Sequence, residues 1–195
     1  MQSKCLKKEM IQMWLSLYAY LGLHAIYRTA EWWSLAKTDT IQLELKRDWT
    51  AGLIAIPFLL VIVSPIFEVG YFTNQPGYVS WIVGTLFFAA AIVVRTKPHL
   101  DLKRAFSLFI EKKEGQKLVE MGLYRYIRHA LYLGNLLLFI ACSLFLGARF
   151  SWIFTLLGLA GILIRIRIEE QFLLKDIEGY REYRQRTWAL FPRVF

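Results

Sequence analysis

The sequence predicts an all-α integral membrane protein, built as a bundle of about five transmembrane helices. Three observations lead to this fold class. Hydrophobic residues make up 56% of the chain and charged residues only 20%, which is less charge than a soluble domain of 195 residues keeps on its surface. Long apolar runs recur, and each can cross the ~30 Å hydrocarbon core of a bilayer as a helix. Lys and Arg gather in only some of the segments between these runs.

The apolar runs define the elements in order. The second run contains Pro57 and Pro65, which a membrane helix tolerates because its neighbours satisfy the freed backbone groups. We expect the third run to end at Arg95 and Pro98. The five predicted spans are residues 10–33, 50–72, 77–94, 130–147 and 150–168.

The fourth and fifth runs are joined by a very short turn around Ala148 and Arg149. So short a connection predicts an antiparallel helical hairpin. Gly158, Ala160 and Gly161 in the fifth run predict that another helix approaches closely there, since small residues let helix backbones come together in a membrane. No linker divides the chain, so we expect a single membrane domain over the whole sequence.

The distribution of Lys and Arg predicts the orientation. With five spans, the side that holds the N-terminus and the Arg149 turn has four Lys and Arg. The side that holds residues 34–49, residues 95–129 and the tail from Arg165 has nineteen. Because basic loops stay in the cytoplasm, we expect the N-terminus outside and the C-terminus inside. The net charge of +9 then reflects loops that face anionic membrane lipid, and we expect no nucleic-acid partner.

Three smaller features complete the survey. Residues 100–110 alternate charged and apolar groups at helical spacing, which predicts an interfacial amphipathic helix. Glu68 lies near the outer end of the second span, and we expect it at the membrane interface. Cys5 and Cys142 are too few for a disulfide framework, and no His and Cys residues have the spacing of a metal site, so we expect no metal.

The first polar motif lies just before the fourth span and runs from Lys117 to Gly134. Gly122 can supply a tight turn or a close backbone approach. Arg128 and His129 stand at the mouth of the span, with Tyr132 one helical turn later. Such groups are costly in a membrane unless they are paired. Taken as a pattern, they also fit an interfacial anchor of side chains that reach toward the headgroups.

The second polar motif is Glu169 and Glu170, which follow Arg165 and Arg167 where the fifth span leaves the membrane. Adjacent residues cannot share one face of a helix, so we expect one of the two carboxylates to point inward. A helix end with solvated charges fits the same residues.

The third polar motif is the pair Tyr180 and Tyr183, which are one turn apart and would face together on a helix. Arg186 extends this row by three residues. By pattern alone, a charged terminal helix explains these residues as well as a binding site does.

Together the motifs resemble the isoprenylcysteine carboxyl methyltransferase family and its phospholipid-methyltransferase relatives. The resemblance covers about residues 115–195, where order and spacing match jointly, and the N-terminal half is similar only as a set of membrane spans. Ala130 stands where the family usually has Pro, and we expect little loss because Ala also starts a helix well. The matching residues are Leu118, Val119, Gly122, Tyr124, Arg128, His129, Tyr132, Gly134, Glu169, Glu170, Tyr180, Tyr183, Arg186 and Pro192.

The resemblance implies methyl transfer from S-adenosylmethionine, with S-adenosylhomocysteine as product, to the carboxylate of a prenylated cysteine or a similar lipid-like substrate. It places the catalytic region in the loop 95–129 and the tail 169–195, around a cytosolic cofactor pocket. The implied cofactor-binding residues are Gln116, Lys117, Leu118, Val119, Gly122, Tyr124, His129, Tyr132, Leu133 and Glu170. The implied catalytic residues are Arg186, Glu170 and Arg128, and the implied substrate-binding residues are Arg186, Tyr183 and Tyr180.

The implied reaction sets simple chemical demands. A carboxylate is already ionised at neutral pH and needs no general base, so catalysis rests on alignment and desolvation. Arg186 is our first choice to hold the acceptor carboxylate and Arg128 our second. Glu170 would orient an arginine or bind polar groups of the cofactor.

Two other activities and one non-enzymatic role compete with this interpretation. Amine methylation of a phospholipid headgroup would need a base such as His129 or Glu170. A sterol-reductase-like oxidoreductase would use NADPH, although such chains are much longer. A membrane scaffold gives no reason for Arg128, Glu170 and Arg186 to occur together. The expected partners are the lipid-like substrate and membrane lipids, with the protein a monomer.

Overall fold

The computed structural model describes residues 2–36, 49–72, 76–102 and 118–191. In these ranges the chain is helical and contains no strand, which confirms the predicted all-α membrane fold. The elements in order are α1 (Gln2–Ala36), η1 (Trp49–Ala51), α2 (Gly52–Phe72), α3 (Tyr78–Leu102), η3 (Gly122–Arg125), α4 (Ala130–Phe145), α5 (Ser151–Asp176) and α6 (Tyr180–Arg186).

The five long helices occupy the five predicted spans. By length and composition, α2, α3 and α5 can each cross a membrane, and α4 is a shorter apolar helix. The third helix does not end at Arg95, as the sequence suggested, but continues through Pro98 to Leu102. A proline costs a helix one hydrogen bond. Pro98 and the neighbouring His99 are both buried, so packing holds the helix together there. The predicted helix over residues 100–110 lies almost entirely outside the described residues.

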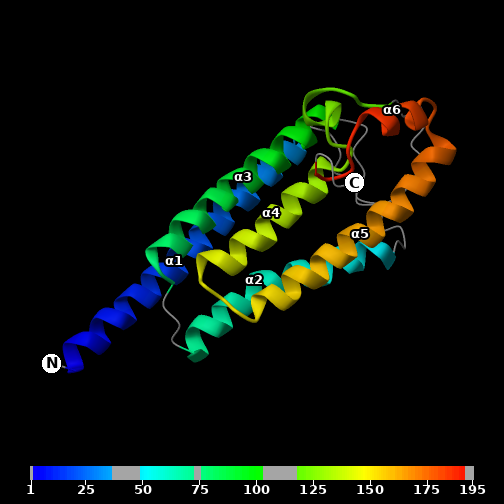
Figure 1. Cartoon of the computed structure of the whole chain (residues 1–195). Coiled ribbons are helices and arrows are strands. Elements are labelled where there is room, and N and C mark those ends of the chain that lie inside the picture. The colour runs from blue at the N-terminus through cyan, green and yellow to red at the C-terminus, as the bar shows by residue number, and fades with distance from the viewer. Residues whose placement is uncertain (1, 37–48, 73–75, 103–117, 192–195) are drawn as a thin grey trace.

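The bundle is arranged around α4. Figure 1 shows α3 and α1 on one side of α4, and α5 with α2 on the other. The small residues of α5 work largely as predicted. A Cβ atom on Gly161 would lie 2.2 Å from the Leu53 carbonyl oxygen of α2, and one on Gly158 would lie 2.3 Å from the Phe139 ring of α4. Ala160, in contrast, is exposed and lies in no such contact.

The hairpin predicted between α4 and α5 is present, and Glu68 of α2 holds its turn. Glu68 is only 5% exposed. Its Oε2 accepts hydrogen bonds from the backbone N–H groups of Arg149 (2.6 Å) and Phe150 (3.0 Å), and its Oε1 accepts one from Ser151 (2.8 Å). Glu68 is therefore buried within the protein, where its carboxylate caps the N-terminus of α5, since free N–H groups there favour an anion.

Polar contacts also cross the bundle between α1, α3 and α4. Arg95 Nε donates to Glu31 Oε1 at 2.8 Å, and Arg95 Nη1 donates to Asn135 Oδ1 at 2.7 Å. Deeper along α1, His24 Nε2 lies 3.4 Å from the free thiol of Cys142. Interhelical hydrogen bonds of this kind hold membrane helices together.

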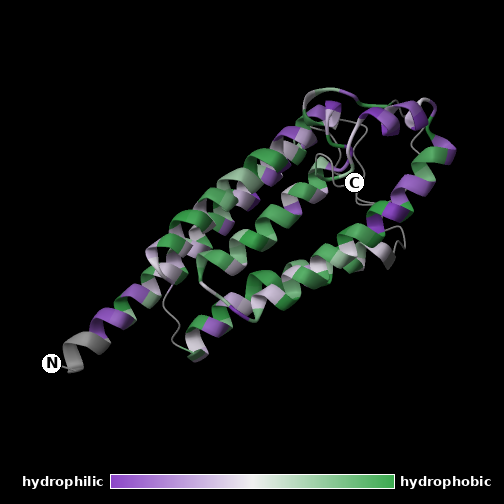
Figure 2. Ribbon diagram, in the orientation of Figure 1, coloured by the Kyte–Doolittle hydropathy of each residue, from purple (hydrophilic) through white to green (hydrophobic). Residues whose placement is uncertain are grey.

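Hydropathy separates the two regions of the molecule. Figure 2 shows hydrophobic residues along the helices of the bundle and hydrophilic residues where α5 ends and α6 and η3 lie, with a smaller hydrophilic stretch near the N-terminus of α1. All three polar motifs of the sequence fall at the end where α6 and η3 lie. The fold thus places a polar region at the mouth of an apolar bundle.

Candidate active site

The chain after α6 runs beside the segment that precedes α4 and fixes it through the backbone. The N–H of Arg128 donates to the Trp188 carbonyl (2.8 Å) and that of His129 to the Ala189 carbonyl (3.0 Å), while Trp188 N–H donates back to Tyr126 (2.9 Å). Segments from two distant motifs are thereby joined, and the Arg128 and His129 side chains are presented next to α5 and α6.

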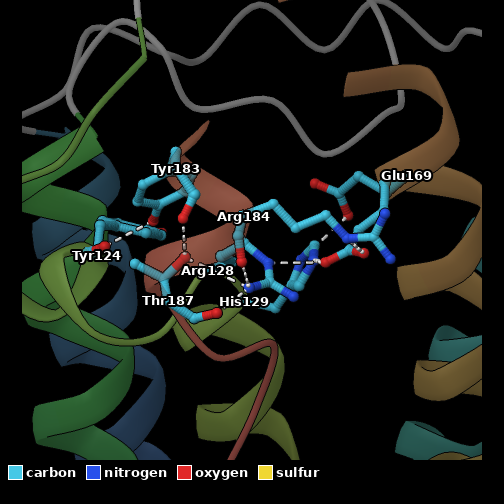
Figure 3. Close-up of polar contacts among 8 residues, drawn as sticks. Tyr124, Arg128, His129, Glu169, Tyr183, Arg184 and Thr187 are labelled. Carbon is cyan, nitrogen blue, oxygen red and sulfur yellow. Dashed lines mark hydrogen bonds and ion pairs between the residues drawn. The ribbon is translucent and has the colours of Figure 1, made fainter. Parts of the chain in front are cut away.

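Arg128 is the centre of the polar cluster. Its Nε donates to Glu170 Oε1 at 2.8 Å, and its Nη1 donates to the backbone carbonyls of Arg184 (3.0 Å) and Thr187 (Figure 3). The side chain is only 6% exposed. A planar guanidinium with five donors suits this task, since one side chain ties α5 and α6 to the start of α4.

His129 lies between the two carboxylates of α5. Its Nε2 is 3.3 Å from Glu170 Oε1, and its Nδ1 is 3.9 Å from Glu169 Oε2. Tyr132 stacks on the imidazole, with ring centroids 5.7 Å apart, and donates its hydroxyl proton to Glu169 Oε2 at 2.7 Å. Arg165 Nε in turn donates to the Tyr132 hydroxyl at 2.8 Å.

The sequence predicted that one of the two carboxylates points inward, and Glu170 is buried, with 8% of the residue exposed. Adjacent residues of α5 do point in different directions. However, His129 and Tyr132 at the start of α4 lie across that face of α5, so Glu169 and Glu170 each find a partner there. Glu169 is therefore an additional member of the cluster, since the sequence interpretation assigned a role only to Glu170.

The turn that contains η3 packs against α6. Gly122 has φ +60°, the left-handed conformation of a tight turn, and a Cβ atom there would lie 2.0 Å from the side-chain oxygen Oδ2 of Asp101. Tyr183 donates its hydroxyl proton to the Tyr124 carbonyl at 2.6 Å. Burial raises the pKa of Tyr183 to about 12, so the phenol stays protonated and remains a donor at neutral pH.

Tyr180 and Tyr183 face together on α6 as predicted, with ring centroids 5.8 Å apart. Leu118 packs against this pair. The Tyr180 hydroxyl is buried and has no hydrogen-bond partner within the described residues. Burial raises its pKa as well, which keeps the proton on this oxygen. An unpaired buried hydroxyl is rare because it costs free energy, and it often marks a place where a ligand or water binds.

The remaining predicted site residues do not all lie in the polar cluster. Arg186 is 59% exposed and pairs with Glu120 at 2.5 Å, apart from the contacts of Arg128. Val119 is half-buried, and Leu133 packs against the main hydrophobic core. Gln116, Lys117 and Pro192 lie outside the described residues.

Residues that the sequence interpretation missed complete the cluster. Arg184 Nε pairs with Glu170 Oε2 at 3.1 Å, and the Thr187 carbonyl accepts from Arg128. Nothing in the sequence separates Arg184 from the other arginines of the tail. Glu169 could have been found, because two consecutive carboxylates at the end of an apolar helix are costly unless both are paired.

The comparison with protein families decides which known group these motifs represent. Residues 83–175 match the model of the isoprenylcysteine carboxyl methyltransferase (ICMT) family. Over this segment the chain is similar to the ICMT family. The match contains the first two polar motifs, in the order and spacing on which the resemblance rested.

Two individual proteins are also similar to this chain. Methanethiol S-methyltransferase 2 of Bradyrhizobium diazoefficiens (strain JCM 10833 / BCRC 13528 / IAM 13628 / NBRC 14792 / USDA 110) is 31% identical over 119 residues, which are 60% of this chain and 45% of the relative. The solved structure of the eukaryotic intramembrane Ras methyltransferase ICMT matches with a TM-score of 0.74 at 20% identity. That match covers 94% of this chain and 68% of the other, and it supports the fold.

Proposed function

We propose that this chain is an S-adenosylmethionine-dependent methyltransferase that transfers a methyl group to the carboxylate of a prenylated cysteine or a similar lipid-like substrate. The observation that carries the proposal is the cluster around Arg128 and Glu170. It joins the polar motifs of a chain similar to the ICMT family at the polar end of an apolar bundle. A site at that boundary can receive a water-soluble methyl donor from one side and an apolar acceptor from the other.

The residues around the cluster fit S-adenosylmethionine. The buried, unpaired Tyr180 hydroxyl offers one hydrogen bond to a ligand. Glu169 and Glu170 supply negative charge, which suits the sulfonium and ammonium groups of the cofactor. The positive φ of Gly122 lets backbone approach closely. When bound, the cofactor supplies an activated methyl group. We expect Leu118, Tyr124 and Tyr180 to hold it.

The residues of this chain would then align an anionic acceptor. The acceptor carboxylate needs an arginine that can reach it, and the Nε and Nη1 atoms of the buried Arg128 already donate to Glu170 and to backbone carbonyls. Arg186 is more accessible, and its partner is Glu120. We therefore infer that an acceptor carboxylate replaces Glu120 on Arg186, since a bidentate arginine–carboxylate pair fixes orientation as well as charge. Burial of the other groups excludes water from the reaction.

Calorimetric binding tests the cofactor. S-adenosylhomocysteine would be titrated into detergent-purified protein, with NADPH as the control ligand. We expect S-adenosylhomocysteine to bind and NADPH not to. Binding of NADPH alone would move the chain to the oxidoreductase alternative and end the methyltransferase proposal.

A thiol is the second candidate acceptor. The relative from Bradyrhizobium is a methanethiol S-methyltransferase, although the aligned part covers less than half of that protein. Incubation with labelled S-adenosylmethionine and either N-acetyl-S-farnesylcysteine or methanethiol separates the two acceptors, because one yields a methyl ester and the other a thioether.

The membrane orientation is a further part of the proposal. With the N-terminus outside, the polar cluster and α6 face the cytoplasm, where S-adenosylmethionine is found. Cysteines introduced at Glu9 and at Glu182 should then react with a membrane-impermeant maleimide from opposite sides of intact cells and inverted vesicles. Labelling of both from the same side would contradict the orientation.

A further inference from the structure

Arg95 is a charged residue that the fold places inside the apolar bundle. It lies on α3, and its side chain is only 14% exposed. An arginine inside a membrane bundle is costly and marks a place with a function. Its Nε donates to Glu31 Oε1 on α1, and its Nη1 donates to Asn135 Oδ1 and, at 3.3 Å, to the Leu131 carbonyl on α4. One guanidinium therefore joins three helices, and two of these three contacts are with the start of α4.

Gly134 lets α3 and α4 come close enough for these contacts. A Cβ atom at Gly134 would lie 3.3 Å from the backbone N and from the Cβ of Arg95. A larger side chain would therefore push the two helices apart, as small residues at helix contacts in membranes show. The glycine belongs to the first polar motif but, having no side chain, it contributes no group to the polar cluster. Its role is to bring the first turns of α4 against Arg95.

The part of α4 that Arg95 holds also carries Tyr132. The residues that Arg95 contacts on α4 flank this tyrosine in the sequence. The Tyr132 hydroxyl contacts Arg165 and Glu169, which both belong to α5. The N-terminus of α4 has no side-chain cap, and helix ends fray. Because the hydroxyl lies at the far end of a long side chain, a small movement of this turn would carry it away from Glu169.

Glu31 fixes the direction of the Arg95 guanidinium. Its Oε1 accepts from Arg95 Nε at 2.8 Å, while its Oε2 accepts from Arg28 Nη1 at 2.5 Å. Glu31 is buried, whereas the Arg28 side chain is 59% exposed. The carboxylate thus balances the charge of Arg95 in the interior, where an unpaired charge is strongly destabilising. Through this pair, α1 takes part in placing the start of α4.

We propose that Arg95 is a positioning residue for the methyl donor. The proposal rests on the S-adenosylmethionine-dependent function proposed above, in which Glu169 supplies negative charge to the cationic donor. Arg95 holds the start of α4 from the α3 side, this turn places the Tyr132 hydroxyl, and the hydroxyl orients Glu169 toward the sulfonium. Arg95 acts through these two residues and not by contact with the donor. It therefore sets how strongly the site favours a positive charge at the position of the sulfonium.

Two ligands of similar shape but different charge test the proposal. S-adenosylhomocysteine has a neutral thioether where the donor has its sulfonium, whereas sinefungin carries a protonated amine at that place. Calorimetry on detergent-purified protein would compare both ligands in the wild type and in Arg95→Lys. Lysine keeps the charge beside Glu31 but lacks the planar fork that reaches α4 at the same time. We expect sinefungin to bind about tenfold more weakly and S-adenosylhomocysteine to stay within about threefold.

Three further variants sharpen this test. Asn135→Ala removes an acceptor on α4, leaves the pair of Arg95 and Glu31 in place, and should show the same selective loss. In a Tyr132→Phe background, Arg95→Lys should cause little further loss, since coupled residues are not additive. Arg149→Gln changes an exposed arginine at the opposite end of α4. It is the matched control and should bind both ligands as the wild type does.

The outcomes separate this inference from the proposed function. A selective loss of sinefungin binding in Arg95→Lys and Asn135→Ala supports the positioning role. Equal losses of both ligands would mean that Arg95 only stabilises the bundle, and would overturn the proposal. Sinefungin affinity that stays at the wild-type level in both variants would overturn it as well. In either case the methyltransferase function stands, because the wild type still binds S-adenosylhomocysteine. If the wild type binds neither ligand, the proposed function itself is wrong, and this inference is wrong with it.

Discussion

Arg128 and Glu170 form a buried ion pair, with Nε and Oε1 2.8 Å apart and both side chains no more than 10% exposed. The arginine also donates to two backbone carbonyls of the tail, at Arg184 and Thr187. A single guanidinium thus holds the start of α4, the end of α5 and the chain around α6 together. The ion pair therefore holds the polar end of the molecule together, and any ligand bound there depends on it.

Removal of Arg128 should destabilise the protein far more than removal of Arg184. Arg128→Ala leaves Glu170 buried next to fewer cations, and breaking a buried pair costs about 3–5 kcal/mol. Arg184 is 49% exposed, and an exposed pair contributes about 0–1 kcal/mol. Arg184→Ala keeps the backbone carbonyl that Arg128 uses, so it is a matched control. Thermal unfolding in detergent measures both, and equal losses would show that Arg128 does not hold the region together.

Glu68 should stabilise the α4–α5 hairpin through its oxygen atoms. Glu68→Ala leaves three backbone N–H groups of the turn without their acceptor, and we expect a loss of about 1–3 kcal/mol in unfolding free energy. Glu68→Gln keeps one acceptor oxygen and loses mainly the charge at the helix N-terminus, worth about 0.3–1 kcal/mol. Denaturant unfolding should rank wild type above Gln above Ala. A Gln variant as unstable as the Ala variant would contradict the capping role.

Gly122 and Gly179 separate backbone strain from steric overlap. Both have positive φ, at +60° and +77°, so an alanine at either position costs about 1–2 kcal/mol. At Gly179 nothing lies within 4 Å of the added Cβ, whereas at Gly122 it would meet Asp101 Oδ2 at 2.0 Å. We therefore expect Gly122→Ala to lower S-adenosylhomocysteine affinity and stability more than Gly179→Ala. Calorimetry and thermal unfolding of the two variants check this, and equal effects would show that the contact with Asp101 contributes nothing beyond the backbone strain.

Arg186 should act on turnover and not on cofactor binding. Arg186→Ala is expected to abolish methyl transfer to a carboxylate acceptor and to leave S-adenosylhomocysteine affinity within about threefold. Glu120→Gln frees the guanidinium of its partner and should lower KM for that acceptor. Steady-state kinetics with N-acetyl-S-farnesylcysteine and calorimetry measure the two effects. A parallel fall in cofactor affinity for Arg186→Ala would place this residue in the cofactor pocket instead.

Local pattern was sufficient for the helices and for part of the site. Apolar length placed the five long helices, and the short turn at Arg149 predicted the α4–α5 hairpin. The positive φ of Gly122 and the shared face of Tyr180 and Tyr183 also followed from residue type and spacing. These features depend on neighbours within one turn, so a sequence contains them directly.

Contacts between polar residues on different helices could not be predicted from their spacing in the sequence. The partners of Glu68 could not be predicted, because the N–H groups that begin α5 are distant from it in sequence. Glu169 was assigned no role because the face of α4 that receives it is set only when α4 and α5 pack. Arg186 follows Tyr183 by three residues, as the sequence interpretation noted. Its contact with Glu120, which precedes η3, could not be predicted from that spacing.

The sequence by itself determined that this chain is a helical membrane protein with its polar motifs at one end, because the lengths of apolar runs and the positions of charges are read directly along the chain. Only the tertiary structure decided which charges are paired and which group is free. Arg128 donates to Glu170 and two carbonyls, whereas among the described residues the polar contacts of Glu169 are with a phenol and an imidazole. Whether a polar group is neutralised or available depends on distances between segments, and packing sets those distances.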